Sequence, residues 1–122
     1  MKLVRDRIPE LAAANGQPAS FHHADPDEFA QRLRAKLLEE AHEAATAGSP
    51  VALLEELGDV LQVLYALAEL AGLEPACIEA ARVRKARTHG SYARRLVWHQ
   101  PASHHGRPHG HHSPRGHLPC LS

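Results

Sequence analysis

Residues 36–59 read KLLEEAHEAATAGSPVALLEELGD, and this stretch decides the fold that we predict for the chain. It holds two carboxylate pairs, each spaced three residues apart: Glu40 with Glu43, and Glu56 with Asp59. Residues three apart lie on the same side of an α-helix. The Gly-Ser-Pro sequence between the pairs indicates a break between two helices. If the two helices fold back as an antiparallel hairpin, the four acids converge on one place.

The helix before the break is predicted over residues 25–47. Asp25 suits the N-cap, Pro26 suits the first helical position, and Glu28 follows the cap by three residues as in a capping box. Its apolar residues recur at helical spacing and form one stripe: Phe29, Leu33, Leu37, Ala41 and Ala44.

The acids of this helix differ in their position around the axis. Glu40 falls inside the edge of the apolar stripe, with Lys36 and Glu43 beside it, whereas Glu39 is turned further toward solvent. Acids that border an apolar stripe are costly to bury without a partner. We therefore interpret Glu40 and Glu43 as functional and Glu39 as a solvated side chain.

The helix after the break begins with Ser49 as its N-cap and Pro50 at its first position. Glu56 and Asp59 lie on the shoulder of its apolar stripe, next to Val63. The stripe is predicted to comprise Leu53, Leu57, Val60, Leu61, Leu64, Leu67 and Ala68.

The register of the hairpin brings the two carboxylate pairs to the same height. The first pair lies roughly seven to eight residues before Ser49, and the second lies roughly eight to nine residues after it. At about 1.5 Å per residue, their heights differ by only about 1.5 Å. Spacing, position on the helix and register all predict a single acidic site.

The remaining segments are predicted from their caps and composition. A short helix precedes residue 16, residues 17–24 form a loop, and a third long helix runs from 74 to 89, where Gly90 ends it. Residues 93–98 (ARRLVW) are predicted to form a short strand or a packed arm. We expect one all-α domain over residues 1–98.

Residues 99–122 are rich in histidine, proline and glycine and contain hardly any aliphatic side chain. Such a composition buries too little apolar surface to offset chain entropy, so we predict a disordered tail. Its histidines suggest adventitious metal binding, and a metal-handling role for the tail is an alternative.

The whole chain has 122 residues and a formal net charge of zero, so no strong field attracts nucleic acid or an anionic membrane. No apolar run is long enough to span a membrane, and we expect a cytoplasmic protein. The second long helix is apolar over more than half its circumference, including Leu54, Tyr65 and Leu70. One hairpin hardly covers that surface, so we predict a homodimer or homotetramer.

Crowded carboxylates repel one another unless a cation lies among them. Mg²⁺ prefers oxygen ligands, and carboxylates and substrate phosphates often bind it together. Mn²⁺ is an alternative cation. The acidic centre is flanked in sequence by basic segments, and no glycine-rich phosphate loop is present. These features favour metal-dependent hydrolysis of a phosphoanhydride.

Three segments carry a resemblance to a known family. The motifs KLLEE (36–40) and EELGD (55–59), together with the start KLVRDRIP (2–9), resemble the MazG-like all-α nucleoside triphosphate pyrophosphohydrolases. That group includes dimeric dUTPases and phosphoribosyl-ATP pyrophosphohydrolase. Lys85 and residues 90–92 are similar to a looser form of the closing element of a small subgroup.

The resemblance implies hydrolysis of the α–β phosphoanhydride of a nucleoside triphosphate, with Mg²⁺, to a monophosphate and pyrophosphate. The residues that it implies as catalytic metal ligands are Glu40, Glu43, Glu56 and Asp59. Those that it implies as candidates for binding the nucleotide are Lys36, Arg5, Arg7 and Lys85. For these four cations, ordinary surface charge or an intrahelical ion pair is the alternative.

Two alternatives to this function stay open at this point. The first is an enzyme restricted to a single substrate, phosphoribosyl-ATP or dUTP. The motifs do not separate it from a broader enzyme, because the contacts to the base come from loops and neighbouring subunits. Alternatively, the chain could be a non-catalytic helical interaction module whose acid cluster is a structural cation site.

Overall fold

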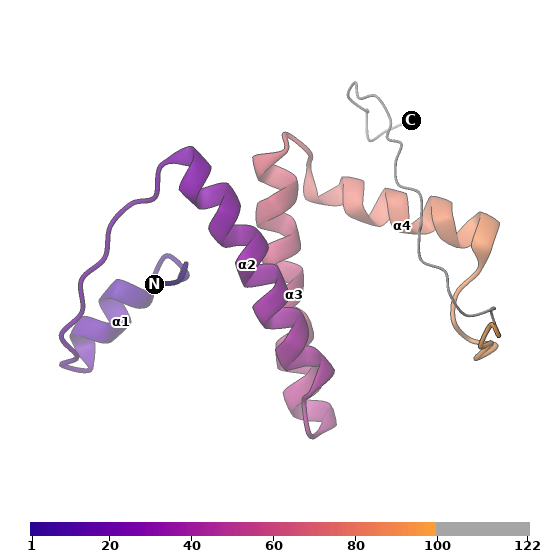
Figure 1. Cartoon of the computed structure of the whole chain (residues 1–122), viewed down its shortest axis with the longest axis horizontal. Helices are drawn as coiled ribbons and strands as arrows, with labels where there is room; N and C mark the ends of the chain where they lie inside the picture. Colours follow the sequence, from indigo (N-terminus) through magenta and orange to yellow (C-terminus); the bar gives the residue numbers. More distant parts are fainter. Residues whose placement is uncertain (100–122) are drawn as a thin grey trace. The chain divides into compact units, whose positions relative to one another are not determined.

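The structure of the protein is a computed structural model that describes residues 1–99. Within this range it is all-helical (Figure 1), which confirms the predicted fold class. The helices are α1 Ile8–Ala14, α2 Pro26–Ala45, α3 Pro50–Leu70 and α4 Pro75–His89. The chain divides into two units, Met1–Gly72 and Leu73–Ser122, so α1 to α3 belong to the first and α4 to the second.

The N-termini of α2 and α3 are capped as predicted. Asp25 accepts a hydrogen bond from the backbone N–H of Glu28 at 2.9 Å, and Ser49 accepts one from that of Ala52 at 3.1 Å. The two caps satisfy N–H groups that have no partner within the helix. The carboxylate of Glu28, however, does not complete a capping box, because it bonds to Arg32 and His22 instead.

The C-terminus of α2 lies two residues before the predicted end. At that end, the backbone N–H and the hydroxyl of Thr46 both donate to the carbonyl of His42, at 3.1 and 2.9 Å. Beyond α3 and α4, Gly72 and Gly90 adopt positive φ angles of 78° and 83°. Such angles favour glycine and stop a helix.

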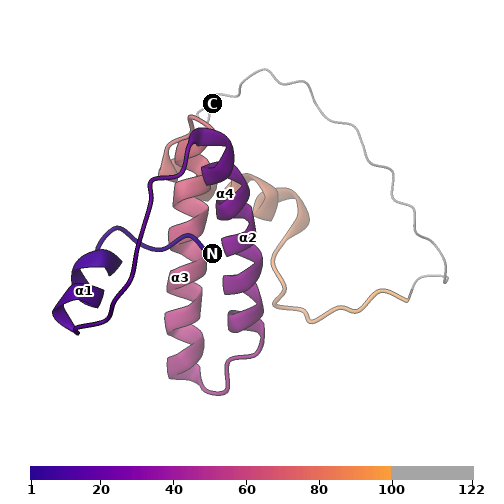
Figure 2. The same cartoon turned by 60° about the vertical axis from the view of Figure 1, so that its left-hand side comes forward.

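Helices α2 and α3 pack side by side as an antiparallel hairpin (Figures 1 and 2). Its core is thin, because Leu33, Val63 and Ala68 are the buried apolar residues of the described chain. The turn at Ser49 and the two long helices therefore position the site more than a large core does.

The face of α3 that packs against α2 matches the predicted stripe in part, since Ala68 is buried and Val60, Leu64 and Leu67 are half-buried. Val63, predicted to lie on the shoulder, is buried, while Leu53, Leu57 and Leu61 remain 39%, 49% and 42% exposed. The packed face is thus rotated toward the side that carries Glu56. Much of the leucine surface of α3 is left uncovered within this chain.

Residues 93–98 do not form the predicted strand or packed arm. They begin with a turn in which the N–H of Arg95 donates to the carbonyl of Tyr92 at 3.0 Å. Leu96, Val97 and Trp98 are all more than 70% exposed, so apolar packing within the chain does not fix them. The predicted tail, apart from His99, lies outside the described residues.

No helix among residues 1–99 has the length and apolar character needed to cross a membrane.

Candidate active site

Three glutamates from the two helices of the hairpin converge at its centre. One carboxylate oxygen from each of Glu40, Glu43 and Glu56 lies within 4.8 Å of the others. Glu40 is buried, Glu56 is half-buried and Glu43 is exposed, so the cluster opens to solvent on one side. The predicted register of the hairpin accounts for this convergence.

Two of these carboxylate oxygens lack a hydrogen-bond partner in the described part of the chain. Oε1 of Glu40 and Oε1 of Glu56 are both buried and unpaired there. A buried carboxylate oxygen without a donor or cation loses its hydration with no compensation. The donor set is entirely carboxylate oxygen, which is the ligand type that hard divalent cations prefer. The residues therefore fit a divalent cation.

The electrostatics of Glu56 agree with that conclusion. Its pKa is raised, first because the carboxyl group is partly removed from water, and then because Glu43, Asp59 and Glu40 lie close by. Like charges and desolvation both disfavour the ionised form of a carboxyl group. A cation among these groups would offset the repulsion between their charges.

Asp59 lies next to this cluster but pairs with a cation from the N-terminal segment. Nη2 of Arg5 lies 2.6 Å from Oδ1 of Asp59, which joins residues that are 54 positions apart in the sequence. Glu40, Glu43 and Glu56 thus form the close group, and Asp59 connects the group to Arg5.

Lys36 contacts the two adjacent acids Glu39 and Glu40 on α2. Its Nζ lies 3.4 Å from Glu39 and 3.5 Å from Glu40, and its side chain is only 17% exposed. Glu39 also pairs with Lys2 at 3.6 Å. The pKa of Glu39 is lowered, mainly by the charge of Lys36. Glu39 is therefore a partner of two lysines rather than the solvated side chain that the sequence indicates.

The other two predicted cations take no part in the ion pairs given above for Arg5 and Lys36. Arg7 is highly exposed and pairs locally with Glu10 at 3.6 Å. Lys85 is an exposed residue of α4, in the second unit of the chain.

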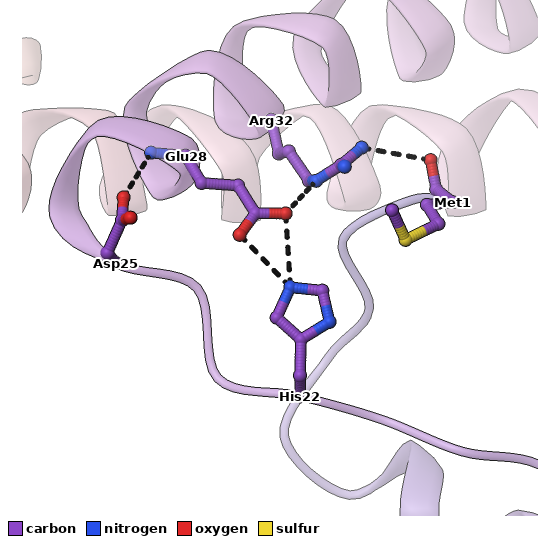
Figure 3. Close-up of polar contacts among 5 residues, drawn as sticks. All are labelled: Met1, His22, Asp25, Glu28 and Arg32. Carbon is purple, nitrogen blue, oxygen red and sulfur yellow. Dashed lines mark hydrogen bonds and ion pairs between the residues drawn. The ribbon is translucent and has the colours of Figure 1, made fainter.

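A second polar cluster, which sequence analysis does not identify, lies at the start of α2 (Figure 3). Nε2 of His22 lies 3.0 and 3.1 Å from the two carboxylate oxygens of Glu28, and Nε of Arg32 donates to Oε2 of Glu28 at 2.7 Å. Nη1 of Arg32 also donates to the carbonyl of Met1 at 3.1 Å. The spacing of four between Glu28 and Arg32 is a signal in the sequence. The contribution of His22 requires the fold of the preceding loop.

A helical hairpin that gathers glutamates from both helices around a potential cation site is the arrangement expected of the MazG-like class of pyrophosphohydrolases. The protein-family model described as phosphoribosyl-ATP pyrophosphohydrolase matches residues 10–87, and the chain belongs to this family. Family membership supports a pyrophosphohydrolase, a hydrolase acting on acid anhydrides. Searches among curated proteins and among solved structures found no match.

Proposed function

We propose that the chain hydrolyses the α–β phosphoanhydride of a nucleoside triphosphate and releases a nucleoside monophosphate and pyrophosphate. The observation that carries this proposal is the convergence of Glu40, Glu43 and Glu56, with buried and unpaired oxygens on two of them. The family match supplies the reaction class.

Mg²⁺ is the proposed cation, with Mn²⁺ as a substitute, and the proposed ligands are Glu40, Glu43, Glu56 and Asp59. When bound, the ion would neutralise phosphate charge and lower the pKa of a water molecule. To join the ligands, Asp59 would give up its ion pair with Arg5 and bind the metal instead. The guanidinium of Arg5 would then be available to phosphate oxygens.

The second part of the proposed mechanism is the binding of the substrate phosphates by the cations beside the acids. Lys36 and Arg5 would bind the phosphate oxygens, and Glu39 would hold Lys36 and Lys2 in position through its ion pairs. In the reaction, the water oxygen bonds to phosphorus, the bridging P–O bond breaks, and pyrophosphate leaves. Because all the acids of the cluster are proposed ligands, bulk solvent would take the proton of the water.

A second candidate is hydrolysis restricted to phosphoribosyl-ATP, which the description of the matching family favours. It uses the same acids and the same bond cleavage, and it differs in the part of the substrate that lies beyond the phosphates.

Pyrophosphate release from a panel of substrates tests both candidates. The panel contains the common nucleoside triphosphates, dUTP and phosphoribosyl-ATP, each with and without Mg²⁺. We expect release that depends on the ion, and a decrease of roughly a hundredfold or more in Glu40→Gln and Asp59→Asn, because a metal contributes several kcal/mol to charge stabilisation. Glu55→Gln, on the exposed side of α3, is the matched control and should keep full activity.

Release from none of these compounds would refute the proposed function. Release undiminished in both acid variants would refute the proposed site. Release from phosphoribosyl-ATP alone would establish the second candidate over the first.

A further inference from the structure

A pocket of about 480 Å³ lies where the N-terminal segment meets the loop before α2 and the first turns of α2. Its volume is within the range of small-molecule sites in proteins. Apolar side chains make up much of its lining, and two of them are aromatic. The apolar and aromatic lining residues include Leu3, Val4, Pro9, Phe21 and Phe29.

The polar lining of the pocket is organised around one carboxylate. Glu28, His22 and Arg32 all line it, and their mutual hydrogen bonds are those shown in Figure 3. The pKa of Glu28 is lowered, chiefly by Arg32 and then by His22, so the carboxylate stays ionised and fixes both partners. Arg32 also holds the backbone of Met1, which ties the N-terminal segment to α2. A few fixed polar groups in an apolar pocket are typical of a ligand site.

Two cations connect this pocket with the acidic residues. Lys2 and Arg5 both line the pocket, and their side-chain nitrogens reach Glu39 and Asp59 at 3.6 and 2.6 Å. Along α2, Arg32 precedes Glu40 by eight residues, which is about 12 Å of helix. Lys2 and Arg5 therefore lie between the apolar lining of the pocket and the acidic residues.

We propose that this pocket binds the nucleoside part of the nucleotide, with the base against Phe21 and Phe29 and the 5′-phosphate side toward Lys2 and Arg5. The inference rests on the proposed function, because it assumes that the phosphates lie at the acidic cluster. It assigns a role to the loop of residues 17–24 and to the N-terminal segment, which supply most of the lining.

The physical reasons are complementary charge and shape. An aromatic base gains from stacking on aromatic side chains, by roughly 1–3 kcal/mol for each base in nucleic-acid complexes. The polyphosphate needs cations between the base and the metal site, and Lys2 and Arg5 lie at that place. A purely apolar ligand would leave these cations and the polar cluster of Glu28 without a function.

The test measures equilibrium binding of the four nucleoside 5′-monophosphates by calorimetry on the full chain, without a divalent cation. Ribose 5-phosphate, which lacks a base, is the comparison ligand. We expect at least one monophosphate to bind roughly tenfold or more tightly than ribose 5-phosphate, and Phe21→Ala to remove that difference. Phe21 is 46% exposed in a loop, so its truncation leaves the hairpin core intact.

Two further variants of the chain serve as controls. Trp98→Ala removes an aromatic side chain that does not line the pocket, and it should bind the monophosphate as the unmodified chain does. Glu40→Gln should also retain this binding while losing pyrophosphate release. In the unmodified chain, nuclear magnetic resonance should show the signals of Phe21 and His22 shifting when the monophosphate is added.

The proposal is overturned if no monophosphate binds better than ribose 5-phosphate, or if Phe21→Ala leaves the affinity unchanged. Either result leaves the proposed function standing when the unmodified chain still releases pyrophosphate. Conversely, monophosphate binding that depends on Phe21 in a chain without hydrolase activity would support the pocket and refute the reaction.

Discussion

The burial of Glu56 and the carboxylates around it are expected to destabilise the folded chain at neutral pH and to favour the binding of a cation. The raised pKa of Glu56 means that the folded state binds a proton more tightly than the unfolded chain does. For a carboxyl group, this contribution to stability is fully present below the unfolded pKa and is lost as pH rises through the folded pKa, which lies above 4.5. At neutral pH and without a cation, Glu56 is therefore expected to destabilise the hairpin.

Glu56→Gln tests this balance. Without a cation at neutral pH, we expect a higher Tm for the variant than for the unmodified chain, because one of several like charges is removed. With Mg²⁺ at a hundredfold excess over Kd, we expect the Tm of the unmodified chain to rise by roughly 10 °C or more, because ligand binding then adds about 2.7 kcal/mol. The variant should lose most of that rise.

Thermal unfolding followed by circular dichroism measures both effects. Glu55→Gln, one position earlier on the exposed face of α3, should change neither quantity. A lower Tm for Glu56→Gln without the cation would contradict the interpretation of the cluster as a site of repulsion.

Arg5 and Arg7 form a matched pair for testing the proposed phosphate contact. Arg5 reaches Asp59 across the first unit, whereas Arg7 pairs only with nearby Glu10 within the described residues. We expect Arg5→Ala to raise KM for the nucleotide roughly tenfold, and Arg7→Ala to leave it within about twofold, because a charged hydrogen bond contributes roughly 1.5–3 kcal/mol. Steady-state kinetics provides the measurement, and equal effects of the two variants would argue against a specific role for Arg5.

At the level of the helix, the cap at Ser49 stabilises the first turn of α3, the helix that carries Glu56 and Asp59. The side chain of Ser49 accepts a hydrogen bond from the backbone N–H of Ala52 in the first turn of α3, directly after the chain reverses. Ser49→Ala should lower the free energy of unfolding by roughly 1 kcal/mol, and Ser49→Gly by only a few tenths. Chemical denaturation checks this order, and a larger loss for glycine than for alanine would show that the side-chain cap is not the source.

Helix boundaries could be predicted from the sequence because their signals are local. The N-caps Asp25 and Ser49, and the positions of Pro50 and Gly90, fix three helices through contacts within a few residues. The two-residue shift at the end of α2 is of the size by which the end of a helix commonly varies, because its last turn frays.

Which face of α3 packs could not be predicted in the same way. Its apolar residues surround most of the helix, so periodicity gives no sharp direction, and Val63 rather than Leu57 is buried against α2. The convergence of Glu40, Glu43 and Glu56 was predictable from spacing and register. The ion pairs of Arg5 and Lys2 were not, because they join the N-terminal segment to α3 and α2 and depend on how the chain between them folds back.

For the molecule as a whole, the thin core raises the question of what covers α3. Three buried apolar residues in the described chain are few for a stable domain of this size. Exposed apolar side chains extend along α3, at Val51, Leu54, Leu57, Leu61 and Tyr65. A contiguous apolar surface of this kind is typical of a protein interface, and a second copy of the chain is the partner that we propose.

Leu61→Glu tests the proposed homodimer or homotetramer, since it places a charge on the uncovered face of α3, where Leu61 is 42% exposed. We expect the unmodified chain to show the mass of a dimer or tetramer by light scattering at micromolar concentration. The variant should dissociate toward the monomer and lose thermal stability, because burying an unpaired charge in an interface is costly. Gln62→Glu introduces the same carboxylate at the adjacent exposed position, and it should keep the mass of the unmodified chain. A monomeric mass for the unmodified chain would refute the predicted assembly, and the stability of the hairpin would then have to come from the single chain.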